Sequence, residues 1–163
     1  MKLIISRHGE SETMSMTGKD RDRKLTETGI SEISMMAKFI RASFLKPKCI
    51  IHSPYLRTTE TAEIYAKGLS LENNFFSSDS LAPDSEYEKI FPELEAFDNS
   101  DTILLVGHNP NVSYFAATLI ENPNLSRSFQ FATGATLALN IPKETFRRGQ
   151  ILWMISPDLL KAN

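Results

Sequence analysis

Residues 3–10 read LIISRHGE, and this stretch decides the fold because a short apolar run ends at once in a polar corner. The arrangement returns as CIIHSP at 49–54 and as ILLVGHNP at 103–110. After each polar corner comes a segment with helical periodicity. Buried parallel strands are nearly continuous apolar runs, and the helices between them cover the sheet. The pattern predicts an α/β fold, a three-layer sandwich around a mostly parallel central sheet.

The helices are predicted from apolar spacing and from their starts. One is expected over 27–45. Its apolar side chains fall on one face at intervals of three and four residues: Ile30, Ile33, Ala37, Ile40 and Phe44. Ser53-Pro54 and Asn109-Pro110 each predict a helix start, with a polar N-cap and a proline at the first helical position. Ser85 and Glu88 have the spacing of a capping box for a short helix.

The carboxyl-terminal part has the alternation of strands rather than the period of a helix. Apolar side chains alternate with others over 136–141 and again over 151–155, with Gly149 near the turn. Two closing strands are therefore expected, and they can pair antiparallel. The polar segment 13–24 is expected to be an exposed loop.

Length and composition indicate an ordinary globular domain. The chain has 163 residues, near the size of one domain of about 150 residues, so a single domain over 1–163 is expected. Apolar residues make up 41% and charged residues 23%, which excludes a disordered chain, a collagen-like fibre and a coiled coil. The net charge of −2 gives no sign of a nucleic-acid or membrane-surface partner. No run approaches the roughly 20 apolar residues of a membrane span.

Cysteine and histidine usage bears on location and metals. Cys49 is the one cysteine, so no internal disulfide can form, and the expected location is the reducing cytoplasm. The apolar run at the amino end is too short for a signal peptide. A triad of His8, His52 and His108 is disfavoured as a metal site, because no carboxylate or cysteine follows at ligand spacing and nearby arginines would repel a divalent cation.

Four candidate site residues follow the predicted strands. Arg7 and His8 follow the first apolar run, Arg57 lies in the helix after the second, and His108 follows the run at 103–106. Ligands of open α/β sheets bind beyond the carboxyl ends of strands, where helix starts also favour anions. Paired arginines can grip phosphate, and a histidine can take a phosphoryl group. A lone histidine or arginine is more often structural, but four at three strand ends favour a phosphate site.

Three ordered motifs carry a family resemblance. They are Arg7-His8-Gly9, the segment SPYLRTTETA at 53–62, and VGHNP at 106–110. Together they resemble the histidine phosphatase superfamily, also called phosphoglycerate mutase-like, over nearly the whole chain. The late segments FATGAT at 131–136 and WMISP at 153–157 are similar to the short SixA-type phosphohistidine phosphatases.

The resemblance implies a phosphoglycerate mutase-like fold without a large cap insertion, and a metal-independent phosphatase that uses no cofactor. His8 would be the nucleophile that forms a phosphohistidine intermediate, while Arg7, Arg57 and His108 would bind the phosphoryl oxygens. A phosphorylated substrate is the implied partner, and a histidine-containing phosphotransfer protein is the one that the resemblance suggests.

The general acid and the substrate stay open at this point. Asp84 and Glu10 are the candidate acids, and both can equally be a helix cap or a solvated loop charge. The nitrogen of a phosphohistidine, once protonated, leaves more readily than an alkoxide, so a site poor in acids favours P–N substrates. The alternatives are a phosphatase of a small phosphomonoester or phosphoramidate, and a phosphate-binding module without turnover. A mutase is least favoured, because the short connection before Gly107 leaves no room for an enclosing cap.

Overall fold

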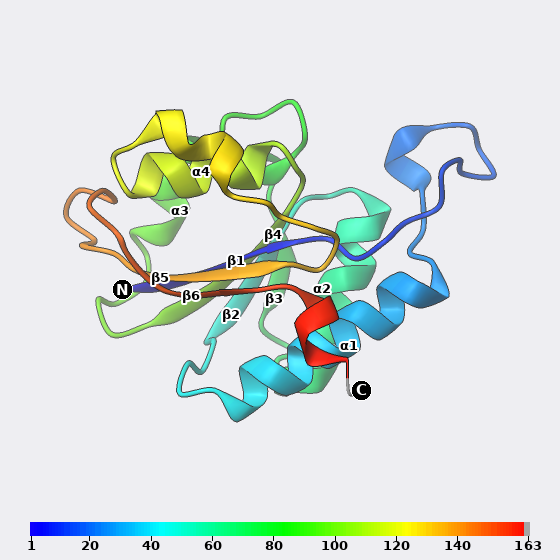
Figure 1. The fold of residues 1–163 in the computed structure, drawn as a ribbon, viewed down its shortest axis with the longest axis horizontal. Coiled ribbons are helices and arrows are strands. Elements are labelled where there is room, and N and C mark those ends of the chain that lie inside the picture. Colours follow the sequence, from blue (N-terminus) through cyan, green and yellow to red (C-terminus); the bar gives the residue numbers. More distant parts are fainter. Residues whose placement is uncertain (162–163) are drawn as a thin grey trace.

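The computed structural model describes residues 1–161, and a six-stranded mixed sheet in the order β3-β2-β4-β1-β5-β6 forms its centre (Figure 1). The strands are Lys2–Arg7 (β1), Cys49–His52 (β2), Phe75–Ser77 (β3), Thr102–Gly107 (β4), Thr136–Asn140 (β5) and Gln150–Ile155 (β6). Strands β1 to β4 pair in parallel, whereas β5 runs antiparallel to both β1 and β6. The predicted α/β class with a mostly parallel sheet is confirmed, and the two closing strands are antiparallel.

Helices cover both faces of the sheet. The α-helices are Glu27–Ala42 (α1), Leu56–Leu69 (α2), Phe91–Leu94 (α3) and Asn111–Leu119 (α4). The 3-10 turns are Asp20–Asp22 (η1), Asp79–Leu81 (η2), Tyr87–Ile90 (η3), Pro123–Ser128 (η4) and Pro157–Leu160 (η5). Alternate residues of each strand face opposite sides, so Ile4 and Ile50 pack against α1 and α2, while Ile5 and Ile51 pack towards α3 and α4. This gives the predicted three-layer sandwich.

Helix α1 is shorter than predicted. It ends at Ala42 rather than at residue 45, because Ser43 is extended and its N–H and hydroxyl both bond back to the carbonyl of Ile40. Phe44 therefore lies beyond the helix and is 71% exposed. Ile30 lies at the edge of the apolar stripe and is also exposed, whereas Met36 is fully buried beside Ile33. Of the five residues predicted on one apolar face, Ile33, Ala37 and Ile40 are buried, whereas Ile30 and Phe44 are exposed.

Two predicted helix starts are displaced, that of α2 by two residues and that of α4 by one. Helix α2 begins at Leu56 and α4 at Asn111, so neither Ser53 nor Asn109 is an N-cap. The Ser53 hydroxyl contacts the ring of His108 instead, and the Asn109 side-chain oxygen accepts a hydrogen bond from Ser113. The Ser53 side chain thus bonds to His108, and the Asn109 side chain bonds to the Ser113 hydroxyl in α4. Neither caps a free N–H of the first helical turn.

The predicted capping box of Ser85 and Glu88 is also wrong. Residues Tyr87–Ile90 form a 3-10 turn whose N-cap, Glu86, makes no side-chain capping bond. The Ser85 carbonyl instead accepts a hydrogen bond of 2.8 Å from the amide of Asn111. Between β3 and β4 the described residues form only the 3-10 turns η2 and η3 and the short helix α3. No large cap therefore covers the sheet edge in the described residues.

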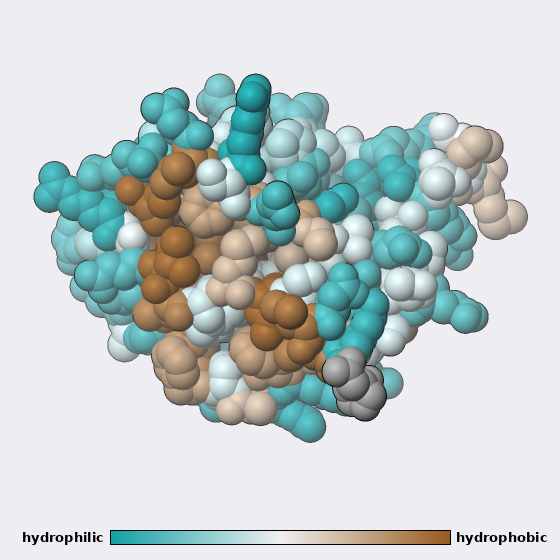
Figure 2. Space-filling view, viewed as in Figure 1, coloured by the Kyte–Doolittle hydropathy of each residue, from teal (hydrophilic) through white to brown (hydrophobic). Residues whose placement is uncertain are grey.

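Strand β6 is the exposed edge of the sheet beside β5. Its apolar side chains at Ile151, Leu152 and Met154 remain partly exposed, because one edge of the strand has no neighbour among residues 1–161. Figure 2 shows hydrophobic side chains gathered on this side of the molecule. Across the described part of the chain, none of the helices combines the length and the apolar character needed to cross a membrane.

Candidate active site

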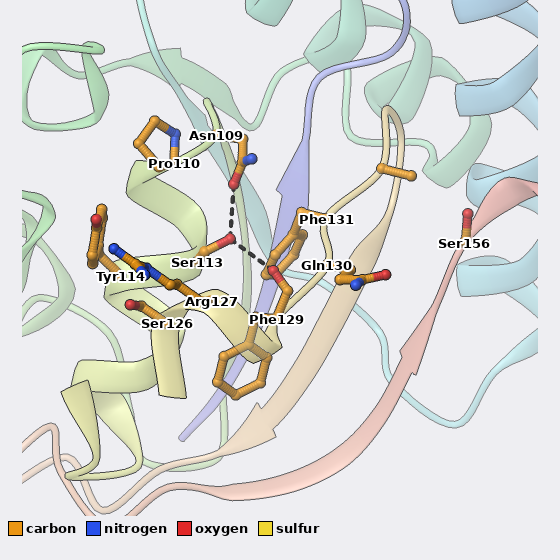
Figure 3. Close-up of a pocket in the computed structure, with 11 residues that line it drawn as sticks. Asn109, Pro110, Ser113, Tyr114, Ser126, Arg127, Phe129, Gln130, Phe131 and Ser156 are labelled. Carbon is orange, nitrogen blue, oxygen red and sulfur yellow. Dashed lines mark hydrogen bonds between the residues drawn. The ribbon is translucent and has the colours of Figure 1, made fainter. Parts of the chain in front are cut away.

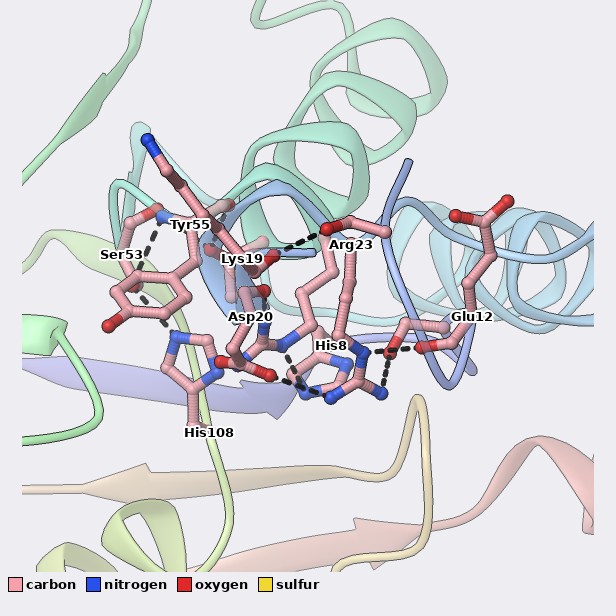
Figure 4. A network of polar contacts seen from close by, with 12 residues as sticks. His8, Glu12, Lys19, Asp20, Arg23, Ser53, Tyr55 and His108 are labelled. Carbon is pink, nitrogen blue, oxygen red and sulfur yellow. Dashed lines mark hydrogen bonds and ion pairs between the residues drawn. The ribbon is translucent and has the colours of Figure 1, made fainter. Parts of the chain in front are cut away.

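The carboxyl ends of β1, β2 and β4 meet at one edge of the sheet, and the predicted site residues converge there (Figure 4). Strand β1 ends at Arg7 and leads into His8, while β4 leads into His108. Arg57 is the second residue of α2, which follows β2. The rings of His8 and His108 lie 5.3 Å apart, and Arg57 Nε lies 3.3 Å from His8 Nε2.

Two glycines allow the strand ends to pack closely. A Cβ atom on Gly9 would lie 2.7 Å from the carbonyl oxygen of Gly29 in α1. A Cβ atom on Gly107 would lie 2.5 Å from the hydroxyl of Tyr87. Contacts this short do not occur for real Cβ atoms, so only glycine fits either corner. The two histidines beside these glycines are therefore held on tightly packed backbone.

His8 is a neutral ring with one nitrogen free to react. Its Nδ1 lies 2.7 Å from the carbonyl oxygen of Gly9, and because a carbonyl can only accept, Nδ1 carries the proton. The other nitrogen, Nε2, then has a lone pair, and Arg57 Nε–H points at it. Burial, with help from Arg57 and Arg7, lowers the pKa of His8 to about 4. The ring is thus unprotonated at neutral pH and set up as a nucleophile.

His108 is held from two sides and has one unused nitrogen. Its backbone N–H donates to the hydroxyl of Tyr87 at 2.9 Å, and its Nε2 lies 2.8 Å from the hydroxyl of Ser53. Ser53 already accepts from the N–H of Tyr55, so it can donate to Nε2 and leave the ring proton on Nδ1. That Nδ1 is buried and has no hydrogen-bond partner. Burial first, and then His8, lowers the pKa of His108 to about 2.

The two arginines border the same spot. Arg7 Nη1 donates to the carbonyl of Phe131 at 2.8 Å, whereas its Nε is buried without a partner. Arg57 is buried and lies under the ring of Tyr55, with its Cζ 5.0 Å from the ring centre. Burial lowers the pKa of both guanidiniums, but an arginine keeps its charge at any physiological pH.

The unused nitrogens indicate what the site binds. Buried polar atoms normally have partners, and an unpaired one costs free energy. Here Arg7 Nε and His108 Nδ1 are both unpaired beside two positive charges. A tetrahedral oxyanion such as a phosphoryl group would supply acceptors to both at once. No cluster of three or more histidine, cysteine or acidic side chains in the described residues is arranged to hold a metal.

Sequence analysis missed one charged residue of the site. Asp20, in the 3-10 turn of the loop 11–26, contacts Arg57 twice: its carbonyl accepts from Nη1 at 2.8 Å and its carboxylate from Nη2 at 3.1 Å. Figure 4 shows this carboxylate between the loop and the two histidines. The loop contains several charges and no periodic pattern, so its sequence carries no signal that would single out Asp20.

The structure separates the candidate acids and His52 from this cluster. The Glu10 carboxylate is exposed and accepts from the hydroxyl of Thr26 at 2.7 Å. Asp84 is exposed on a turn whose neighbouring carbonyls bind the amide of Asn111. The ring of His52 bonds to the carbonyl of Ser53 and packs against Phe75, 5.9 Å between ring centres.

A groove of about 640 Å³ opens beside the cluster (Figure 3). Its wall includes Asn109 and Pro110, which directly follow His108, and Phe131, whose carbonyl binds Arg7. Tyr114 and Arg127 line it from α4 and η4. The groove therefore continues the site outwards along the surface and is open to a bulky ligand.

The low pKa values predict a dependence of stability on pH. Unfolded histidines titrate near about 6.5, whereas His8 and His108 stay neutral in the fold down to about 4 and about 2. Below about pH 6.5 the unfolded chain then binds more protons, so the free energy of unfolding should fall as the pH drops from 7 towards 4. Urea denaturation at several pH values measures the free energy of unfolding. His108→Gln should weaken the dependence of this free energy on pH. Equal slopes for both proteins would contradict this account.

The fold and the site together define a class: an α/β sandwich that binds an oxyanion around a neutral histidine. Comparison with known proteins agrees. The family model described as histidine phosphatase superfamily (branch 1) matches residues 3–76. Phosphohistidine phosphatase SixA of Escherichia coli K12 is 27% identical, over 99% of this chain and 97% of its own length. A SixA homolog of Haemophilus influenzae is 30% identical, over 84% of this chain and 87% of its own length.

A solved structure extends the likeness to three dimensions. SixA complexed with tungstate matches with a TM-score of 0.86 and 27% identity, and the match covers 99% of this chain and all of that one. The chain belongs to the histidine phosphatase superfamily and is a homologue of SixA, a hydrolase. The predicted family, and the phosphoglycerate mutase-like fold that it implied, are therefore confirmed.

Proposed function

We propose that this protein is a metal-independent phosphatase that removes phosphoryl groups from phosphohistidine in proteins, through a phosphohistidine intermediate on His8. The observation that carries the proposal is the state of the His8 ring. Its Nδ1–H is engaged by the Gly9 carbonyl, its pKa is lowered to about 4, and its free Nε2 faces Arg57. The homology to SixA, a phosphohistidine phosphatase, supports the same function.

The reaction has two steps. His8 Nε2 attacks phosphorus, the bond from phosphorus to the substrate nitrogen breaks, and the leaving imidazole takes up a proton. Water then attacks the phosphoryl group on His8, which releases inorganic phosphate and restores the lone pair on Nε2. The charge on the equatorial oxygens is stabilised by Arg7, Arg57 and the Nδ1–H of His108, which are already in place before substrate arrives.

The preference for a P–N bond rests on the missing acid. An alkoxide must be protonated as it leaves, whereas a phosphohistidine nitrogen is a better leaving group once protonated by solvent. Asp84 and Glu10 are exposed, and the Glu10 carboxylate accepts from Thr26. Arg23 first, then Arg57, hold the pKa of the nearby Asp20 carboxyl below its ordinary value. Asp20 is therefore an anion at neutral pH and has no proton to give.

The groove supports a substrate of protein size. It has a volume of about 640 Å³ and is lined by Asn109, which follows His108, and by Phe131, whose carbonyl binds Arg7. No large cap among residues 1–161 closes it. A histidine exposed on a folded protein, such as a histidine-containing phosphotransfer protein, can reach such a site. Residues 1–163 would act as one catalytic domain, and a reducing compartment such as the cytoplasm suits Cys49, which is free and buried.

The first experiment compares phosphate release from a phosphohistidine peptide and from a simple phosphomonoester, with chelator present. We expect faster release from the peptide, and no release from it with His8→Ala. Equal or faster release from the ester would instead favour a small-molecule phosphatase, with Asp84 and Glu10 as the next residues to change. Tight phosphate binding without any release would indicate a binding module.

A further inference from the structure

We propose that Asp20 is a specificity-determining residue that occupies the phosphoryl-binding side of Arg57 in the free protein and has to be displaced by an incoming phosphoryl group. This inference rests on the proposed function. Arg57 has three N–H positions in contact: Nε–H faces His8, Nη1 donates to the Asp20 carbonyl, and Nη2 donates to the Asp20 carboxylate. Three of its five N–H groups are therefore engaged before any substrate is present, and both terminal nitrogens contact Asp20.

The carboxylate resembles the group that it replaces. One oxygen of Asp20 lies 3.1 Å from Arg57 Nη2, and the other lies 2.9 Å from Arg23 Nη1. A carboxylate that accepts from arginine N–H groups makes the kind of contact that a phosphoryl group makes, and Arg57 is the donor that Asp20 shares with the proposed phosphoryl site. Arg23 and Arg57 also keep the pKa of Asp20 below its ordinary value, so the mimic is charged at neutral pH.

Hydrogen bonds within the loop 11–26 and at its base hold Asp20 beside Arg57. Thr17 donates to the carboxylate of Asp22 at 2.5 Å, and the hydroxyl of Ser15 donates to the carbonyl of Lys19 at 2.7 Å. At its base, the N–H of Leu25 donates to the carboxylate of Glu60 in α2 at 2.7 Å. These bonds on both sides of the turn hold the carbonyl and carboxylate of Asp20 against Arg57, while the Asp20 side chain stays 58% exposed to solvent.

Displacement of Asp20 makes the site selective for large substrates. A free phosphate ion must compete with the carboxylate using its own charge alone. A phosphorylated protein can in addition contact the loop, which projects from the body of the molecule and exposes Met14 and Met16 near its tip (Figure 1). Binding free energy from such remote contacts can offset the loss of the Asp20 contact. Released inorganic phosphate makes no contact with the loop, so the Asp20 carboxylate displaces it from Arg57.

The test measures the affinity of the full chain for inorganic phosphate and for tungstate by calorimetry. Asp20→Asn keeps the shape of the side chain but removes its charge, and we expect about tenfold tighter binding, equivalent to about 1.4 kcal/mol. Glu12→Gln is the matched control, because it removes one charge from the same loop and its exposed carboxylate makes no hydrogen bond or ion pair within residues 1–161. It should change the affinity by less than about twofold.

Two outcomes would overturn the proposal: weaker oxyanion binding by Asp20→Asn, or the same change in both variants. Asp20→Ala provides a second variant, and thermal melts confirm that each protein is folded. A failure of the proposed function looks different, because the wild-type protein would then release no phosphate from a phosphohistidine peptide whatever the affinities of the variants.

Discussion

His8→Ala is expected to lower the rate of phosphate release by at least about 10³-fold, because no other group in the site can take the phosphoryl group. His108 is close, but its Nε2 is held by the hydroxyl of Ser53, and its unpaired Nδ1 carries the ring proton and so has no lone pair for attack. Binding of inorganic phosphate should persist in His8→Ala, since Arg7 and Arg57 remain. Initial rates with a phosphohistidine peptide, together with calorimetry of phosphate binding, measure both effects.

His52→Gln is the matched control for this variant. The Nδ1 of His52 contacts the carbonyl of the next residue at 2.8 Å, as the Nδ1 of His8 does at 2.7 Å, so both side chains brace a strand end in the same way. The His52 ring contacts the Ser53 carbonyl and Phe75 but none of Arg7, His8, Arg57 and His108 within residues 1–161, so its loss should leave most of the rate intact. A His8→Ala protein that keeps the wild-type rate would eliminate the covalent mechanism, and trapping of labelled phosphate on the wild-type protein checks it directly.

Arg57→Ala is expected to weaken both binding and turnover. The Arg57 Nε–H points at His8 Nε2, the proposed nucleophile, so in the proposed mechanism the guanidinium stabilises ground-state and transition-state charge alike. We expect kcat/KM to fall by about 10³-fold, in the range of other arginines that stabilise phosphoryl transfer. The affinity for inorganic phosphate should fall as well, which separates this variant from His8→Ala.

Arg21→Ala serves as the control for Arg57→Ala. Arg21 carries the same charge and also lies over the ring of Tyr55, with its Cζ 6.0 Å from the ring centre, but it is exposed on the loop. Its loss should change kcat/KM by only a few-fold. If the two variants were equally active, the role assigned to Arg57 would be wrong, and general positive charge would explain the site.

Much of the architecture could be predicted because its cause is local. Short apolar runs at 3–5, 49–51 and 103–106 become buried strands wherever helices cover both faces, and that rule requires no knowledge of contacts. Helix limits were less predictable. Ser53 and Asn109 have the properties of N-caps, but Ser53 contacts His108 across the sheet and Asn109 contacts Ser113, and such competing partners are invisible to a local pattern.

The candidate site, like the fold, was predictable from the sequence only in part. Which reactive residues stand at the strand ends follows from the amino-acid sequence, because chain order and the parallel sheet together place Arg7, His8 and His108 at one edge. Their chemical state follows from tertiary packing instead. The neutral His8 ring depends on burial, and the pairing of Arg57 with Asp20 joins residues 37 positions apart. Burial and long-range distance arise from packing of the whole chain, so no local stretch of sequence contains them.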